Sequence, residues 1–344
     1  MNRGWARHAL LAVLSVTLSI LGTCGALLAG DLFLHHRAAR TAGVNMRGYR
    51  GPIVGAKRPG ETRVVVLGGS TAFGYGVGPD ASFPALLERA VNARRAHPGM
   101  ILNVVNLGYN NEGAHAFRFT LEDYRRLGYD GVVLYEGYND LGGHNTSVFR
   151  HDSPIFKLTG YLPIFPMILK EKAMALRYGG NLEAAYEGRE TVFRPNLAER
   201  ATAATLEVGA KIGESLERQV GRLTPEPVFE APAGSSMDCQ EPWRRYCQDV
   251  RAAIEYARGR GAWVLVVTQP YLSDRHVEQQ RCMTAMLTGR FGRDARVRHV
   301  NLGRGVVALN DPTLCYDGMH LTAAGNARIA QALAEPVVEA INTQ

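Results

Sequence analysis

The sequence lacks internal repeats, low-complexity tracts and, over most of its length, any excess of charge. Its 344 residues carry a formal net charge of +7, but residues 1–63 hold nine Lys or Arg side chains and only two acidic ones. The rest of the chain has 30 basic and 30 acidic residues, so it is neutral. A neutral body argues against a nucleic-acid partner, which would need a basic face. The length is enough for one large domain or two ordinary domains with a real core.

Cysteine is scarce as well, with five residues in the chain. Cys24 lies in an apolar run, which leaves Cys239, Cys247, Cys282 and Cys315. An even number of cysteines is compatible with two disulfide bonds in an oxidising compartment. We favour Cys239–Cys247, which closes a short local loop, together with Cys282–Cys315. Four unpaired thiols are the alternative.

One long uncharged run covers Ala9–Gly30, 22 residues with two arginines before it. As a helix it would reach about 33 Å, close to the hydrocarbon thickness of a bilayer. A cleaved signal peptide is the alternative, but its apolar region is normally shorter and ends in a better cleavage site than Cys24-Gly25-Ala26. We therefore expect residues 1–30 to be an N-terminal transmembrane anchor. Residues 31–60, rich in Arg, Gly and Pro, are expected to form a stalk or linker.

Two features of the sequence bear on the orientation of this anchor, and they point in opposite directions. Four arginines follow the span and outnumber the two that precede it, so the positive-inside rule does not favour an exported domain. Cysteine usage favours an oxidising compartment instead. The interpretation adopted is a single-pass protein of the bacterial inner membrane with a periplasmic catalytic domain.

After residue 60, short apolar stretches alternate with segments of helical periodicity. Such alternation predicts right-handed crossovers and a parallel sheet covered by helices on both faces. The expected fold class is therefore α/β, a three-layer α/β/α sandwich with a parallel five-stranded sheet. The expected strands are Arg63–Leu67, Ile101–Asn106, Asp130–Tyr135, Trp263–Val267 and Arg296–Asn301, and Thr322–Ile341 is a closing helix.

Residues 144–247 interrupt the alternation of strands and helices. Leu162–Leu176 is apolar with two prolines, Asn196–Leu223 has helical spacing, and Thr224–Pro242 is rich in Pro, Gly and Ser. We expect a mainly helical insertion within a domain that spans residues 61–344. It would lie over the active face or against the membrane, and a lid without a binding role is the alternative.

A serine stands in the turn that follows the first strand. The β-branched run before it ends in Gly68-Gly69-Ser70, and a helical segment begins near Ser82. Ligands of open α/β sheets bind beyond the carboxyl ends of the strands, and glycines there let a serine present its hydroxyl. No Gly-Lys-Ser or Gly-Lys-Thr follows, which argues against a nucleotide-binding loop. A glycine-rich turn that is merely capped by serine is the alternative.

Asp317 and His320 lie just before the closing helix. Because the two residues are three positions apart, the carboxylate can turn towards the imidazole and hold it. The imidazole could then take a proton from the hydroxyl of Ser70, as a general base does for a serine nucleophile. Taken alone, each of the two residues is more often structural.

Gly108 follows the second expected strand and Asn139 follows the third. Both therefore project at the same edge of the sheet as Ser70. Acyl transfer needs donors aimed at the negative oxygen of the tetrahedral intermediate. The backbone N–H groups of Ser70 and Gly108 and the side-chain amide of Asn139 would supply three. A loop glycine and a turn asparagine are common, so the alternative is two ordinary turns.

Together these residues resemble the four blocks of the SGNH/GDSL hydrolase superfamily. The blocks are Gly68-Gly69-Ser70-Thr71, Asn106-Leu107-Gly108, Gly137-Tyr138-Asn139-Asp140 and Asp317-Gly318-Met319-His320, and Val267-Thr268-Gln269-Pro270 is typical of bacterial members. The resemblance covers about residues 60–340 and departs from the family at Gly69, which replaces the aspartate of the Gly-Asp-Ser form. It implies a flavodoxin-like sandwich, with Ser70 as nucleophile, His320 as base, Asp317 as its orienter, and Ser70, Gly108 and Asn139 as the oxyanion hole.

The sequence therefore favours a membrane-anchored serine esterase that works through an acyl-enzyme on Ser70, without metal or organic cofactor. His35 and His36 are not expected to be ligands. An O-acetylated glycan of the envelope is the first substrate considered and a lipid ester the second. The same residues could pass the acyl group to a sugar hydroxyl, as an O-acetyltransferase does. A non-catalytic glycan-binding protein is the alternative from another class.

Overall fold

The computed structural model describes residues 3–94, 101–142, 153–180, 196–221 and 239–343. The chain divides into two compact units. One comprises Met1–Thr41 and Asp152–Glu226, and the other comprises Ala42–His151 and Pro227–Gln344. The second unit holds the sheet and every residue singled out above for catalysis.

A parallel sheet of five strands forms the centre of the second unit. The strands are β1 (Glu61–Gly68), β2 (Ile101–Asn106), β3 (Gly131–Glu136), β4 (Trp263–Thr268) and β5 (Val297–Asn301). Their order is β2-β1-β3-β4-β5, and every neighbouring pair is parallel. This is the flavodoxin-like order, so the predicted fold class is confirmed. The central strands are near-continuous runs of Val and Leu because helices bury both of their faces.

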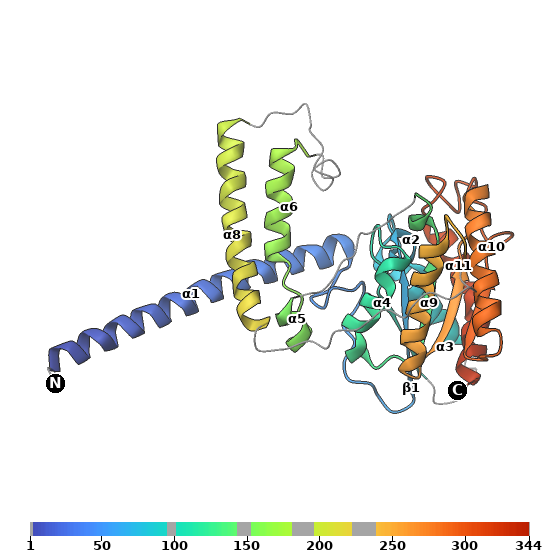
Figure 1. Ribbon diagram of the computed structural model, residues 1–344, viewed down its shortest axis with the longest axis horizontal. Coiled ribbons are helices and arrows are strands. Elements are labelled where there is room, and N and C mark those ends of the chain that lie inside the picture. The colour runs from blue at the N-terminus through green and yellow to red at the C-terminus, as the bar shows by residue number, and fades with distance from the viewer. Residues whose placement is uncertain (1–2, 95–100, 143–152, 181–195, 222–238, 344) are drawn as a thin grey trace. The chain divides into compact units, whose positions relative to one another are not determined.

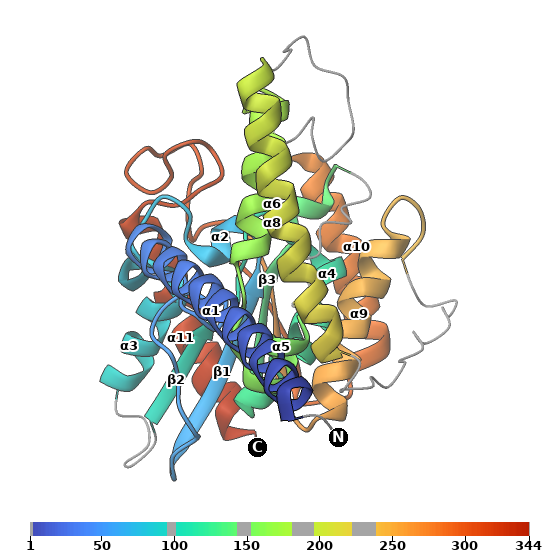
Figure 2. The ribbon, with the colours of Figure 1, turned by 90° about the vertical axis from the view of Figure 1, so that its left-hand side faces the viewer.

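Helices cover the two faces of the sheet (Figure 2). The helices α3 (Phe83–Ala93) and α11 (Ala323–Asn342) pack on one face. The other face carries α4 (Ala114–Asp123) and α9 (Arg244–Gly259), and α10 (Asp274–Phe291) packs beside α9 and β5. Thr322 caps α11, as its side chain accepts a hydrogen bond from the Gly325 N–H. The short elements are α2 (Ser70–Phe73), η1 (Pro79–Ala81), η2 (Arg125–Leu127) and η3 (Tyr138–Asp140).

Residues 31–60, the segment expected to be a stalk, instead belong partly to helix α1 and partly to the α/β unit. Helix α1 runs from Arg3 to Ala42, well past Gly30, because the Leu-, Ala- and Phe-containing sequence after Gly30 continues to favour helix. Beyond α1, the chain pairs with the end of β2 through the Arg50 N–H and the Asn106 carbonyl, 3.1 Å apart. Tyr49 beside it is only 3% exposed. Residues 43–60 are therefore part of the α/β unit.

The first unit combines α1 with α5 (Pro154–Thr159), α6 (Phe165–Arg177) and α8 (Leu197–Gly221). Figure 1 shows α6 and α8 side by side, and Gly209 and Gly213 of α8 leave room for Leu169 and Pro166 of α6. The Pro/Gly/Ser-rich stretch 224–242 lies mostly outside the described residues. The last residues of the expected insertion, from Arg244 on, belong to α9 of the other unit.

Asp31 and His35 join α1 to the start of α6. The Asp31 carboxylate accepts hydrogen bonds from the backbone N–H groups of Ile164 and Phe165, at 2.8 and 2.5 Å, which satisfies two N–H groups at the start of α6. The His35 ring lies 2.8 Å from the Leu162 carbonyl. The part of α1 from Leu10 to Ala42 is long and apolar enough to span a membrane, judged by length and composition. These two side chains then mark where α1 takes up contacts with the rest of its unit.

One of the two favoured disulfide bonds is present. Cys239 is bonded to Cys247 at the start of α9, whereas Cys282 and Cys315 are free. The predicted Cys282–Cys315 pair is therefore wrong. Cys315 is buried in the core under α3 and α11, while Cys282 lies on α10, which packs against α9 and β5.

This arrangement predicts a specific pattern of thiol labelling. Alkylation of the unreduced, denatured chain should modify Cys24, Cys282 and Cys315, and reduction should be needed before Cys239 and Cys247 react. Peptide mass mapping with and without reductant measures this. A cross-linked peptide containing Cys282 and Cys315 would contradict the structure.

Candidate active site

Ser70 stands at the point where the strand order of the sheet reverses. It is the first residue of α2, two positions after the end of β1, and β1 pairs with β2 on one side and β3 on the other. This is the position at which open α/β sheets bind ligands. The turn is tight, since a Cβ on Gly68 would lie 2.1 Å from the Tyr135 carbonyl oxygen. Glycine is therefore required for β1 to approach β3 this closely.

The structure brings Ser70, His320 and Asp317 into one hydrogen-bonded chain. His320 Nε2 lies 2.8 Å from Ser70 Oγ, although the two residues are 250 positions apart. On the other side of the ring, His320 Nδ1 lies 2.6 Å from Asp317 Oδ2. A carboxylate on Nδ1 places the proton there, which leaves Nε2 as the acceptor for a hydroxyl proton.

Asp317 is fixed by the backbone that follows it. Its Oδ1 accepts hydrogen bonds from the N–H groups of Met319, at 3.0 Å, and His320, at 2.6 Å. Partial burial tends to raise the pKa of Asp317, but these hydrogen bonds and the one to the imidazole outweigh it, so the pKa lies below its ordinary value. The carboxylate is therefore ionised and oriented at neutral pH.

The other two residues expected in the site are Asn139 and Gly108, and their donor groups have different partners. Asn139, in η3, lies beside Ser70 and donates from Nδ2 to the Glu112 carbonyl oxygen at 2.7 Å. An amide group has two hydrogens to donate, so the second is left for another acceptor. Gly108 packs against the backbone of α2, and its N–H donates to Asn106 Oδ1 at 3.0 Å. Ser70 begins a helix, so its N–H has no partner within that helix.

A small pocket lies beside Ser70, with a volume of about 200 Å³ that includes space open to solvent. Asn139, Glu136 and Gln269 are among the residues that line it, whereas Gly108 is not. Its walls combine polar and apolar surface, and its enclosed part is small. A long alkyl chain would need a larger, apolar cavity.

Sequence reasoning passed over the role of Gln269, although it noted the strand end that contains it. The Gln269 side chain donates to Thr71 Oγ1 at 2.7 Å and accepts from the Tyr138 N–H at 3.0 Å. One buried amide thereby ties the turn of Ser70 to the turn of Asn139. The available signal was a polar residue directly after β4, a strand that is apolar apart from its last residue, Thr268.

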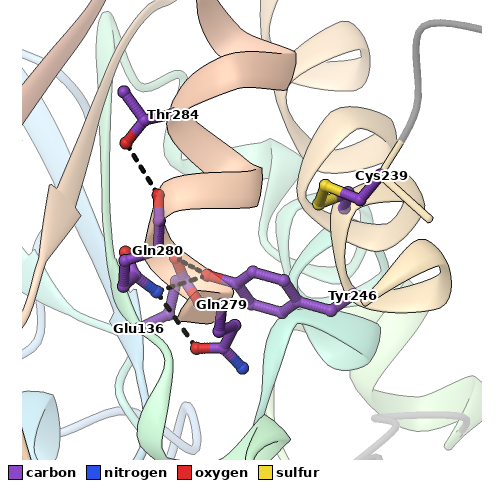
Figure 3. The surroundings of a disulfide bond; sticks show 7 residues. Glu136, Cys239, Tyr246, Gln279, Gln280 and Thr284 are labelled. Carbon is purple, nitrogen blue, oxygen red and sulfur yellow. Dashed lines mark hydrogen bonds between the residues drawn. A yellow bond between two sulfur atoms is a disulfide. The ribbon is translucent and has the colours of Figure 1, made fainter. Parts of the chain in front are cut away.

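Glu136 is a buried carboxyl group at the end of β3, 2% exposed. Tyr246 of α9 donates to Glu136 Oε1 at 2.6 Å, and Gln280 of α10 donates to the Tyr246 oxygen at 2.8 Å (Figure 3). Glu136 Oε2 has no hydrogen-bond partner among the residues that the structure describes. Burial raises the pKa of Glu136 well above its ordinary value, and the nearby charge of Asp140 adds to this. The neutral form of this carboxyl group is therefore favoured in the folded protein.

The raised pKa of Glu136 gives a pH-dependent stability. The folded state favours the neutral carboxyl group, so Glu136 contributes most to the stability of the fold at low pH. This contribution is lost as the pH rises above 4.5, the ordinary carboxyl value, towards the pKa of the folded state. Glu136→Gln keeps the acceptor for Tyr246 and removes the ionisation. We expect the stability of this variant relative to wild type to rise with pH, by at most about 1.4 kcal/mol per pH unit. Urea unfolding from pH 5 to pH 9 measures it, and a constant difference between the two proteins would contradict the assignment.

Metal ligation has no support from side-chain clusters in the described part of the chain. In those residues, no group of three or more His, Cys, Asp or Glu side chains is arranged to hold a metal ion. The expectation that the protein needs neither metal nor organic cofactor stays a prediction. His35 is held by the contacts described for the first unit.

Neither a family model nor a curated protein matches this sequence. Solved structures do resemble the chain in fold. They include a lipolytic protein of the G-D-S-L family from Desulfitobacterium hafniense, with a TM-score of 0.42 and 12% identity over 80% of this chain and 98% of that one. The family 3 carbohydrate esterase of Clostridium thermocellum gives 0.44 and 11% over 82% and 98%, and the acetyl xylan esterase AlAXEase gives 0.41 and 12% over 80% and 99%. The chain is thus similar in fold to G-D-S-L proteins and esterases.

Proposed function

We propose that this chain is a serine esterase of the SGNH/GDSL superfamily, which forms an acyl-enzyme on Ser70. The observation that carries the proposal is the chain of hydrogen bonds from Ser70 Oγ through the His320 ring to Asp317. A hydroxyl, a base and a carboxylate in this order are the parts that nucleophilic acyl transfer needs. They lie at the edge of the sheet where a ligand would bind.

The reaction would proceed in two halves. Ser70 Oγ attacks the ester carbonyl carbon while His320 Nε2 takes the hydroxyl proton, and a tetrahedral oxyanion forms. His320 then gives that proton to the alcohol oxygen as the ester C–O bond breaks, which leaves the acyl group on Ser70. A water molecule repeats the sequence, releases the acid and restores the hydroxyl. Asp317 holds the Nδ1 proton and stabilises the imidazolium in both halves.

The proposed oxyanion hole consists of the Ser70 N–H, the Asn139 side chain and the Gly108 N–H. Asn139 is supported by its place in the pocket beside Ser70 and by its second amide hydrogen. Gly108 would have to exchange its present acceptor, Asn106 Oδ1, for the substrate oxygen. Asn139 should therefore carry the larger share of oxyanion stabilisation.

Gly69 permits the placement of Asn139. A Cβ at position 69 would lie 2.0 Å from Asn139 Nδ2 and 3.0 Å from the Glu112 carbonyl oxygen. We expect Asn139→Ala to lower kcat by about 10²- to 10³-fold, the usual effect of losing one oxyanion donor. Gly69→Ala should cause a similar loss, and the double variant should be little worse than either single one, because both changes remove the same donor.

Steady-state hydrolysis of a small acetate ester measures this prediction. Gly78→Ala is the matched control, since a Cβ there meets nothing within 4 Å and the backbone φ is −64°. Multiplied losses in the Gly69→Ala, Asn139→Ala double variant would show that position 69 acts independently of the asparagine.

The acyl group is proposed to be acetyl and the alcohol to be a hydroxyl of an envelope glycan. The small size of the pocket beside Ser70 supports a short acyl group. Among proteins of similar fold, one is described as a two-domain esterase active on acetylated mannans and another as an acetyl xylan esterase. An enzyme that transfers acetyl to a sugar hydroxyl would need the same residues.

The proposed location is the bacterial inner membrane, with the α/β unit in the periplasm. Residues 1–30 would be the anchor, supported by the apolar composition of α1. The Cys239–Cys247 bond supports an oxidising compartment.

The test uses the full chain in detergent micelles with an O-acetylated xylo-oligosaccharide. Acetate release that disappears in Ser70→Ala supports an esterase. Slow acetate release, together with rapid acetylation of an added unacetylated oligosaccharide, would favour the transferase. Equal rates for wild type and Ser70→Ala would exclude both, and so would the absence of any Ser70 adduct with a fluorophosphonate.

A further inference from the structure

Two exposed tyrosines flank the ring of His320. The centroid of the Tyr75 ring lies 5.0 Å from the centroid of the imidazole, and that of Tyr316 lies 5.9 Å away, nearly parallel to it at 19°. Tyr75 is 50% exposed and Tyr316 is 46% exposed, although both neighbour a mostly buried histidine. Large aromatic side chains beside a reactive group, with free surface, are candidates for ligand contacts.

The chain holds these two rings in place. The Tyr316 hydroxyl donates to the Tyr75 carbonyl oxygen at 3.1 Å. Gly76 has a φ of +84°, and a Cβ there would lie 2.3 Å from the Tyr316 oxygen, so the glycine makes room for that ring. Partial burial, with the charge of Asp317, raises the pKa of Tyr316 to about 12, so its phenol stays a donor. The pair is therefore pre-organised, which lowers the entropic cost of binding.

The chemistry assigns this side of the site to the alcohol part of the ester. The leaving oxygen must come within hydrogen-bond distance of His320 Nε2 to receive its proton. The pocket that would hold the acyl group lies on the Asn139 side and is not lined by His320, Tyr75 or Tyr316. Whatever is attached to the leaving oxygen must consequently extend past the two tyrosine rings.

We propose that Tyr75 and Tyr316 form the alcohol-side subsite and bind a pyranose ring of an O-acetylated glycan through its C–H face. This rests on the proposed esterase function and adds the residues that select its substrate. Two rings with polar hydroxyl tips suit a ligand that is apolar on its faces and polar at its rim. An alkyl chain would be served better by a continuous apolar groove than by two separate exposed rings.

The experiment compares two substrates with the full chain in detergent. One is an O-acetylated xylo-oligosaccharide and the other is ethyl acetate, which shares the acyl group but has no ring. For Tyr75→Ala and Tyr316→Ala we expect the ratio of kcat/KM, oligosaccharide over ethyl acetate, to fall about tenfold, through KM. Tyr75→Phe and Tyr316→Phe should keep most of the ratio, because the rings remain. Tyr256→Ala, on α9, is the matched control.

Binding provides a readout that does not need turnover. Calorimetric titration of Ser70→Ala with the same oligosaccharide should detect binding that weakens about tenfold when Tyr75→Ala or Tyr316→Ala is added. If the tyrosines only position His320, kcat for both substrates will fall in parallel and this binding will not change, which overturns the proposal. Hydrolysis of ethyl acetate without binding of the oligosaccharide also overturns it and leaves the esterase intact. A larger effect on a monoacylglycerol than on the oligosaccharide would assign the subsite to lipids instead.

Discussion

Replacing Ser70 by alanine is expected to lower kcat for ester hydrolysis by about 10⁴-fold or more, while the protein stays folded. The size of the effect follows from the mechanism, because without Oγ no acyl-enzyme forms and His320 has no hydroxyl to activate. Only the oxyanion donors and binding would remain. The stability should change little, since Ser70 is a partly exposed helix-initiating residue whose side chain contacts His320.

Initial rates with a small acetate ester, together with thermal unfolding, measure this prediction. Adding Asp317→Asn or His320→Ala to Ser70→Ala should cause almost no further loss, because the three residues act as one unit. Asp317→Asn alone should also reduce kcat by orders of magnitude, since the imidazole would lose the partner that fixes its tautomer. If each substitution multiplied the loss, the hydrogen-bonded chain would not be the reacting unit.

Arg50→Ala is expected to cost about 3–5 kcal/mol in the free energy of unfolding, a severe effect for one substitution. The side chain is only 6% exposed. Its guanidinium donates to the carbonyl oxygens of Phe73, the last residue of α2, and of Gly74 and Val77 after it. Its Nε donates to the Ala42 carbonyl at 3.0 Å. It also lies over the Phe73 ring, with 4.3 Å between Cζ and the ring centroid. Alanine would leave several buried carbonyl groups without donors.

Urea unfolding followed by tryptophan fluorescence suits this measurement, because Trp243 and Trp263 are buried in the α/β unit. Burial lowers the pKa of Arg50 to about 10, which keeps the group charged at neutral pH. Arg50→Lys should retain the charge but lose the fork of donors, and so recover only part of the stability. Arg94→Ala, at the exposed end of α3, should change stability by no more than about 0.5 kcal/mol. An equal loss of stability in Arg50→Ala and Arg94→Ala would show that Arg50 does not hold the turn after α2 in place.

Arg50 also has a consequence for the boundary of the catalytic domain. Sequence reasoning placed it in a stalk and began the domain at residue 61, because the surrounding composition has no apolar periodicity. Three of the carbonyls that it satisfies, those of Phe73, Gly74 and Val77, lie 23 to 27 positions away along the chain. A protein that begins at residue 61 would lack this brace beneath the turn of Ser70. The soluble form should therefore begin before residue 43.

Much of this protein could be derived from local patterns. The five strands follow from short β-branched and apolar runs, and all five appear within one or two residues of their expected bounds. Two parts of the candidate site are also local. Ser70 lies in the turn after the first strand, and Asp317 and His320 share the turn before the last helix, so three or four neighbouring residues define each. Cys239 and Cys247 are close enough in sequence for the same reasoning to have found their bond.

Only the tertiary structure showed the side-chain contacts between residues that are far apart in the chain. Glu136 is a polar residue at the end of an apolar strand, and nothing near it in sequence announces that Tyr246, 110 positions away, holds it. The separation of Cys282 from Cys315 and the contact of Tyr75 with the ring of His320 have the same origin. Side-chain periodicity reports which face of an element is buried, but not which element covers it. Partners of that kind are chosen by the packing of helices on the two sides of the sheet.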